Sequence, residues 1–143
     1  MSVAANRGHP VIVTFIDPLC RNFCPLEAQG STRWNVRFRQ LTVLAVSVDV
    51  YANARRYLLQ DDREWRLVPE WRWAVGRPSD LAGVWKNYRI GVKVTTWRIN
   101  GTVTYRIDHT EAAYVLDATG HERAMFVWPF NPQDLERVFR QLA

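Results

Sequence analysis

Two nearly unbroken apolar runs constrain the fold of this 143-residue chain more than any other feature. Pro10–Asp17 reads PVIVTFID and Leu41–Val50 reads LTVLAVSVDV. A strand with one solvent-facing side alternates apolar and polar residues, whereas a strand buried on both faces is apolar throughout. Both runs are therefore predicted to be inner strands of a sheet that helices cover on both faces.

The segments between and after these runs read as helices and one further strand. Helices are predicted over Pro25–Leu41, Ala52–Asp62 and Ser79–Ile90, and a third strand over Trp71–Val75. The apolar face of the first helix is predicted to consist of Leu26, Trp34, Phe38 and Leu41. Ser79 is predicted to cap the third helix. Strand and helix thus alternate three times in the first half of the chain.

The second half changes character. Gly91–Thr110 is a long segment rich in β-branched residues, and Ala112–Val127 reads as a hairpin around residues 117–120. A helix is predicted over Asn131–Ala143, with Asn131 as its cap and Pro132 at its first position. This order predicts an α/β protein with a thioredoxin-like fold, in which helices flank a central mixed β-sheet and a hairpin and a helix close the chain. One domain over residues 1–143 is expected.

Charge and hydropathy exclude some classes of partner. The net charge is +5, but the basic residues are scattered, and no run of them is interleaved with aromatic residues. A nucleic-acid groove needs such a run, so no nucleic-acid partner is expected. No apolar stretch approaches the roughly 20 residues of a membrane span.

Cys20 and Cys24 are the only cysteines, and they lie between the first predicted strand and the first predicted helix. Pro25 fits the first turn of that helix, whose N-terminus favours a thiolate. The pair could form a structural disulfide, a redox couple or part of a metal site. A domain of this length folds without a disulfide, which weakens the first interpretation.

A histidine favours the metal interpretation. His109 is predicted to lie in the loop before the hairpin, which a thioredoxin-like sheet brings close to the start of the first helix. His9 and His121 are expected at the surface. Two thiolates and one imidazole suit copper, whereas structural zinc wants a fourth protein ligand. Disulfide exchange by Cys20 and Cys24 as catalytic residues remains open, because the spacing does not decide between the two.

The sequence resembles the SCO/SenC family of copper chaperones, which assist the assembly of cytochrome c oxidase. The resemblance rests on VTFIDPLCRNFCPLEAQ, LAVSVD, WRWAVG, LAGVWKNYRIGV and DHTEAAYVLDATG. It implies that Cys20, Cys24 and His109 bind copper, as Cu(I), Cu(II) or both. It further implies delivery to the dinuclear copper centre of oxidase subunit II. The alternative is a thiol–disulfide oxidoreductase that reduces partner cysteines with the Cys20/Cys24 couple.

The resemblance carries expectations beyond the ligands. Family members usually carry an N-terminal membrane or lipoprotein anchor and act outside the cytoplasm. The anchor and part of the first hairpin are expected to be absent from this chain. The expected partner is oxidase subunit II or another copper or thiol protein. The protein itself is expected to be a monomer. Asp17, before Pro18, departs from the family pattern and is expected to cap a turn rather than bind metal.

Overall fold

The computed structural model describes residues 3–35 and 41–142. A short 3-10 helix, Val3–Asn6, precedes the first strand. The strands are β1 (Val11–Ile16), β2 (Thr42–Ser47), β3 (Trp71–Ala74), β4 (Val92–Ile99), β5 (Thr102–His109), β6 (Ala112–Leu116) and β7 (Glu122–Val127). The helices are α1 (Cys24–Asn35), α2 (Arg55–Glu64), α3 (Pro78–Asn87) and α4 (Pro132–Leu142). No helix within the described residues is long and apolar enough to cross a membrane.

The central sheet has five strands in the order β3-β2-β1-β6-β7. β1, β2 and β3 are parallel, whereas β6 and β7 run antiparallel to their neighbours. In this register Val13 pairs with Leu44 on one side and with Tyr114 on the other. Every residue of β1 is buried, as its unbroken apolar run predicts. The predicted mixed sheet is therefore confirmed.

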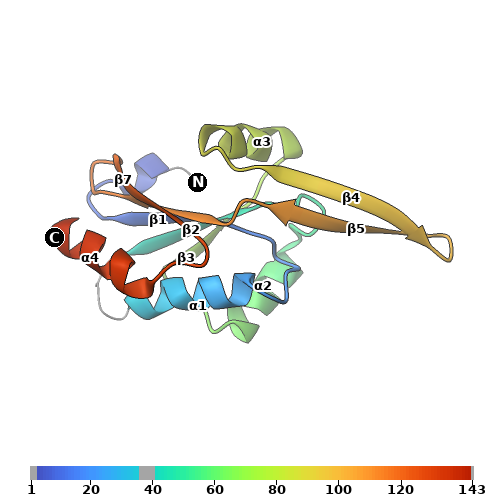
Figure 1. Ribbon diagram of the computed structural model, residues 1–143, viewed down its shortest axis with the longest axis horizontal. Coiled ribbons are helices and arrows are strands. Elements are labelled where there is room, and N and C mark those ends of the chain that lie inside the picture. Colours follow the sequence, from blue (N-terminus) through green and yellow to red (C-terminus); the bar gives the residue numbers. More distant parts are fainter. Residues whose placement is uncertain (1–2, 36–40, 143) are drawn as a thin grey trace.

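Helices cover both faces of the sheet (Figure 1). α1 and α4 pack on one face, where Ala28, Leu135 and Phe139 join a core with Ile12 and Val115. α3 packs on the opposite face through its buried Leu81, within a second core that contains Val13. Because successive side chains of a strand point to opposite faces, β1 contributes to both cores. The predicted thioredoxin-like α/β architecture is thereby confirmed.

The segment that reads only as a long β-rich stretch folds into a separate two-stranded antiparallel sheet, β4–β5. Asn100 and Gly101, both with positive φ, form the turn that joins Ile99 to Thr102. Figure 1 shows this hairpin projecting from the body of the protein. The Tyr105 hydroxyl attaches it to the body by donating a hydrogen bond of 2.8 Å to the buried Asp49.

Three predictions about helix ends and faces meet different outcomes. Asn131 caps α4, since its Oδ1 accepts a 2.9 Å hydrogen bond from the Gln133 amide. Ser79 does not cap α3, because the helix begins one residue earlier and Arg77 holds the cap position without a side-chain bond. The predicted apolar face of α1 is wrong at Leu26, which is 54% exposed.

The remaining residues of that predicted face fall elsewhere. The first helix is described to Asn35 rather than Leu41, and Leu41 is buried just before β2. Phe38 and the side chain of Trp34 lie outside the described residues. Within the described part of α1, the buried side chains are those of Cys24, Glu27 and Ala28.

Candidate metal centre

The loop between β1 and α1 carries the two cysteines and is shaped by Asp17. The Asp17 carboxylate accepts a 2.8 Å hydrogen bond from the Leu19 amide, and its carbonyl accepts one of 3.0 Å from the Cys20 amide. An aspartate that bonds a backbone amide two residues on stabilises a tight turn. Asp17 thus has the turn-forming role that the sequence predicts, and the turn places Cys20 beside the first residue of α1.

Both thiols are free, and they lie against each other at the start of α1. Cys24 is the first residue of the helix and is fully buried, whereas Cys20 is partly exposed. The backbone amide of Cys24 donates to the Cys20 sulfur across 3.4 Å. The amides of a helix N-terminus favour negative charge, so the predicted placement of the pair is also the placement that ionises a thiol.

The two thiols differ sharply in acidity. A hydrogen bond from the Cys24 thiol, helped by backbone amides, lowers the pKa of Cys20 from 9.0 to about 5. That same bond and burial raise the pKa of Cys24. Cys20 is therefore a thiolate at neutral pH and Cys24 is its protonated donor. This asymmetry provides one exposed nucleophile and one buried partner.

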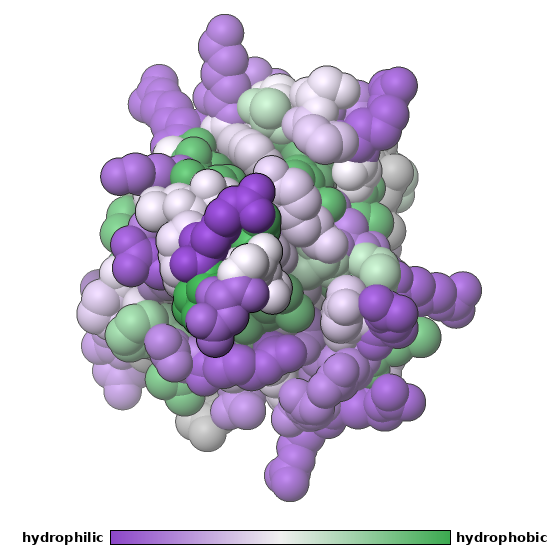
Figure 2. Space-filling model, turned by 90° about the vertical axis from the view of Figure 1, so that its right-hand side faces the viewer, coloured by the Kyte–Doolittle hydropathy of each residue, from purple (hydrophilic) through white to green (hydrophobic). Residues whose placement is uncertain are grey.

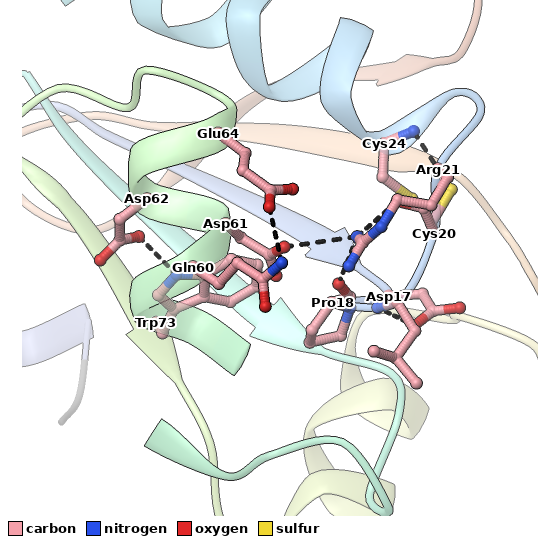
Figure 3. Close-up of polar contacts among 11 residues, drawn as sticks. Asp17, Pro18, Cys20, Arg21, Cys24, Gln60, Asp61, Asp62, Glu64 and Trp73 are labelled. Carbon is pink, nitrogen blue, oxygen red and sulfur yellow. Dashed lines mark hydrogen bonds and ion pairs between the residues drawn. The ribbon is translucent and has the colours of Figure 1, made fainter. Parts of the chain in front are cut away.

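Arg21 ties the cysteine loop to α2 (Figure 3). Its guanidinium donates to Asp61 across 3.3 Å and to the carbonyls of Pro18 and Cys20 across 3.0 Å and 3.1 Å. Asp61 is fully buried, and burial raises its pKa to about 7 although Arg21 opposes that rise. The Arg21 guanidinium is thus engaged by α2 and by the loop backbone.

His109 reaches the cysteines from the far end of the chain. It is the last residue of β5 rather than part of a loop, which corrects the predicted location. Nδ1 of its ring lies 3.1 Å from the Thr110 carbonyl. Because a carbonyl only accepts, Nδ1 is the donor in this contact, and Nε2 is left available to bind a metal. The expected proximity of His109 to the start of α1 is present.

One cluster unites three possible metal ligands. Single ligand atoms of Cys24, His109 and Glu111 all lie within 4.8 Å of one another. The Cys20 sulfur is outside this trio and joins it through its contact with Cys24. The structure thus gathers all three residues predicted to bind metal, while their role as ligands remains a prediction. Glu111 is an addition that the sequence reasoning missed.

A signal for Glu111 was present in the sequence. His109 and Glu111 are two residues apart at the end of an extended segment. Alternate residues of an extended chain point the same way, so a metal-ligating histidine brings the residue two positions on toward the site. Burial raises the pKa of the Glu111 carboxyl, while His109 opposes that rise.

Glu27, one helical turn after Cys24, is a second residue that sequence reasoning missed. It is fully buried, and its Oε1 accepts a hydrogen bond from the Thr14 hydroxyl on β1. Its Oε2 has no hydrogen-bond partner among the described residues. Burial raises the pKa of this carboxyl to about 7, although Thr14 opposes the rise. No local pattern in the sequence distinguishes it from a surface glutamate.

A cavity of about 740 Å³ opens beside the cysteine loop. It is lined by Cys20, His109 and Glu111, by acidic Asp17 and Asp49, and by residues 103–108 of β5. Figure 2 shows the end of the molecule from which the hairpin projects, and hydrophilic side chains dominate this face. Cys20 is partly exposed and lines this cavity, so its thiol can be reached from solvent.

A mixed sheet with two thiols at the N-terminus of its first helix defines a thioredoxin-like protein. Within this class, the chain has the fold of Sco proteins. Copper-bound ScoI of Bradyrhizobium japonicum shares 18% identity at a TM-score of 0.80, over 100% of this chain and 90% of that one. Copper-bound ScoI of Arabidopsis thaliana shares 17% identity at a TM-score of 0.81, over 99% of this chain and 90% of that one.

A SCO1/SenC family lipoprotein from Bacillus anthracis is 16% identical at a TM-score of 0.77, over 99% of this chain and 86% of that one. No family model matches the sequence, and no curated protein matches it. At these identities the likeness establishes the fold.

Proposed function

We propose that the chain is a copper-binding metallochaperone of the Sco type, which delivers copper to the dinuclear copper centre of cytochrome c oxidase. The observation that carries this proposal is the position of His109, which comes from β5 to within 4.8 Å of the Cys24 ligand atom. Disulfide exchange needs no imidazole at this place, whereas a soft metal ion gains a third ligand from it. The copper-bound structures of the same fold support the choice of metal.

The donor set fits copper. Cys20 and Cys24 supply thiolate sulfur and His109 supplies Nε2, and these ligands suit Cu(I) and also accept Cu(II). Cys20 already has a pKa of about 5 and is ionised at neutral pH, whereas Cys24 is protonated and has to lose its proton when it binds metal. Binding therefore releases a proton, and affinity falls as the solution becomes more acidic.

Titration of the reduced protein with Cu(I), with free thiols counted before and after, tests the proposal. One copper per chain that protects both thiols is expected. His109→Ala should weaken this binding by at least about tenfold, a loss that even outer-shell changes produce at metal sites. His121→Ala is the matched control, because that side chain is 76% exposed in the β6–β7 turn. Equal affinity for Cu(I) in wild type and His109→Ala would rule out the three-ligand site.

Thiol–disulfide exchange is the second candidate, and the acidity of Cys20 favours it. The Cys20 thiolate would attack a partner disulfide to form a mixed disulfide and release one partner thiolate, which takes up a proton. Cys24, on losing its proton, would then attack Cys20. That step forms the Cys20–Cys24 disulfide and leaves the partner with two reduced thiols. Cys24→Ser should trap the mixed disulfide; failure to trap it with any disulfide substrate would exclude this activity.

The proposed partner is subunit II of cytochrome c oxidase or another copper or thiol protein. We place the work of this domain outside the cytoplasm and close to a membrane, with support from the lipoprotein of the same fold. A monomer is the proposed form, since the ligands come from one chain. Gel filtration with light scattering checks that form, and a dimer at micromolar concentration would contradict it.

A further inference from the structure

Glu111 occupies a position that the three-ligand copper site does not require. Its carboxylate lies in the same 4.8 Å cluster as Cys24 and His109, on the rim of the cavity that Cys20 also lines. Among the described residues, none forms a hydrogen bond or an ion pair with that carboxylate. Within the described part of the chain, the carboxylate therefore faces the candidate ligands without another partner to hold it elsewhere.

The backbone around Glu111 is fixed from two sides. The Glu111 carbonyl accepts a 3.0 Å hydrogen bond from the Trp128 amide. Its neighbour Thr110 exchanges two bonds with Gly91, in which the Thr110 amide donates across 3.0 Å and the Gly91 amide donates to the Thr110 hydroxyl across 3.1 Å. A ligand on such a braced segment is held at the site before any metal arrives, and this lowers the cost of ordering it.

Neighbouring Asp108 shows that nearness to His109 alone does not make a ligand. Its carboxylate pairs with Arg106 across 3.0 Å and is half exposed. It lies outside the 4.8 Å cluster, although it adjoins His109 directly in the sequence. Asp108 and Glu111 are thus two carboxyl groups near the same histidine, and of the two only Glu111 lies in the cluster of candidate ligands.

We infer that Glu111 is the fourth ligand of this centre, giving a set of two sulfurs, one nitrogen and one oxygen. The inference rests on the proposed function for the roles of Cys24 and His109. A carboxylate is a hard ligand that contributes little to Cu(I) and favours divalent ions. Four protein ligands also match the tetrahedral preference of Zn²⁺. Glu111 therefore extends the site from a three-ligand centre for Cu(I) to a four-ligand centre for divalent metals.

Co²⁺ and Zn²⁺ are the probes for this inference. Co²⁺ binding is followed by its visible absorption in the reduced full-length chain under anaerobic conditions, and Zn²⁺ is then added in competition. Glu111→Gln should weaken the binding of both ions by at least about tenfold, because even substitutions outside the ligand shell cause losses of that size. The Cu(I) affinity of the same variant should stay at the wild-type value. Asp108→Asn, which removes the same charge, should leave all three affinities unchanged.

The outcomes separate this inference from the proposed function. Unchanged Co²⁺ and Zn²⁺ binding in Glu111→Gln overturns the fourth ligand, and so does an equal loss in Asp108→Asn, which would mark a general effect of charge. A selective loss in Glu111→Gln supports it. If the wild-type chain binds Co²⁺ through Glu111 but no copper, the chaperone proposal fails while the inference about Glu111 holds.

Discussion

Burial of the Glu27 carboxyl predicts a contribution to the pH dependence of stability, and Glu27→Gln should remove that contribution. The side chain is fully buried, and the Thr14 hydroxyl donates to one oxygen while the other has no partner among the described residues. Desolvation raises the pKa of this carboxyl from 4.5 to about 7. Glutamine keeps an acceptor for Thr14 but cannot ionise, so the variant separates the charge from the shape of the side chain.

The sign follows from proton binding. Between pH 4.5 and about 7, the folded protein holds the Glu27 proton while the unfolded chain has lost it. The free energy of unfolding therefore falls as pH rises through this window. With about 1.4 kcal/mol for each pKa unit, ionisation of Glu27 lowers wild-type stability by about 3 kcal/mol once the pH exceeds the folded pKa. Below pH 4.5 this contribution is absent.

Urea unfolding of the wild type and Glu27→Gln, at a series of pH values from about 4 to about 8.5, measures the effect. The difference in unfolding free energy should change by about 3 kcal/mol in favour of the variant across the window. Asp17 and Asp61, whose pKa values burial also raises, are present in both proteins and cancel in the difference. A difference that stays constant with pH would refute the argument, because Glu27 would then ionise as freely when folded as when unfolded.

Three further predictions concern the thiols, the hairpin and the core. Cys24→Ala removes the hydrogen-bond donor to Cys20 and should raise the Cys20 pKa from about 5 by roughly 1–2 pH units, as measured by a titration of thiolate absorbance. Cys24→Ser keeps a donor, so an equal rise in that variant would contradict this cause. Tyr105→Phe leaves buried Asp49 without that bond and should cost about 1–3 kcal/mol in urea unfolding; no loss would mean that the contact adds nothing. Leu135 on α4 is fully buried, so Leu135→Ala should cost about 2–5 kcal/mol by the same assay. A loss below about 1 kcal/mol would argue against this packing.

Most of the fold follows from patterns that act locally. The unbroken apolar runs at residues 10–17 and 41–50 predict β1 and β2, because only a strand covered on both faces can be apolar throughout. Asn131 predicts the start of α4 through a single capping bond. The turn at Asn100-Gly101 was a readable hairpin signal that the β-rich composition of its surroundings obscured.

The face of α1 could not be read in the same way. Leu26 is exposed while Glu27 and Ala28 are buried, so hydropathy points in the wrong direction at the start of this helix. The helix packs a carboxylic acid into the core because Thr14, on a neighbouring strand, accommodates it. Tertiary contacts of this kind override local periodicity.

Part of the candidate centre could likewise be predicted from the sequence, and part could not. The two cysteines lie close together in the sequence, at the start of α1, so the sequence alone indicates the pair. The low pKa of Cys20 arises first from the hydrogen bond with the Cys24 thiol, a contact that the structure supplies. His109 could be placed only through an assumed fold. Arg21 and Asp61 meet across 40 positions of sequence, and no local pattern predicts that pair.

X-ray absorption of the Cu(I)-loaded protein tests the central claim most directly, since it reports the atoms bound to the metal. The account predicts two sulfur ligands and one imidazole nitrogen, with the imidazole signal lost in His109→Ala and retained in His121→Ala. A spectrum with sulfur ligands alone in the wild type, or an imidazole signal that survives His109→Ala, would contradict the assignment of Cys20, Cys24 and His109 as one copper site.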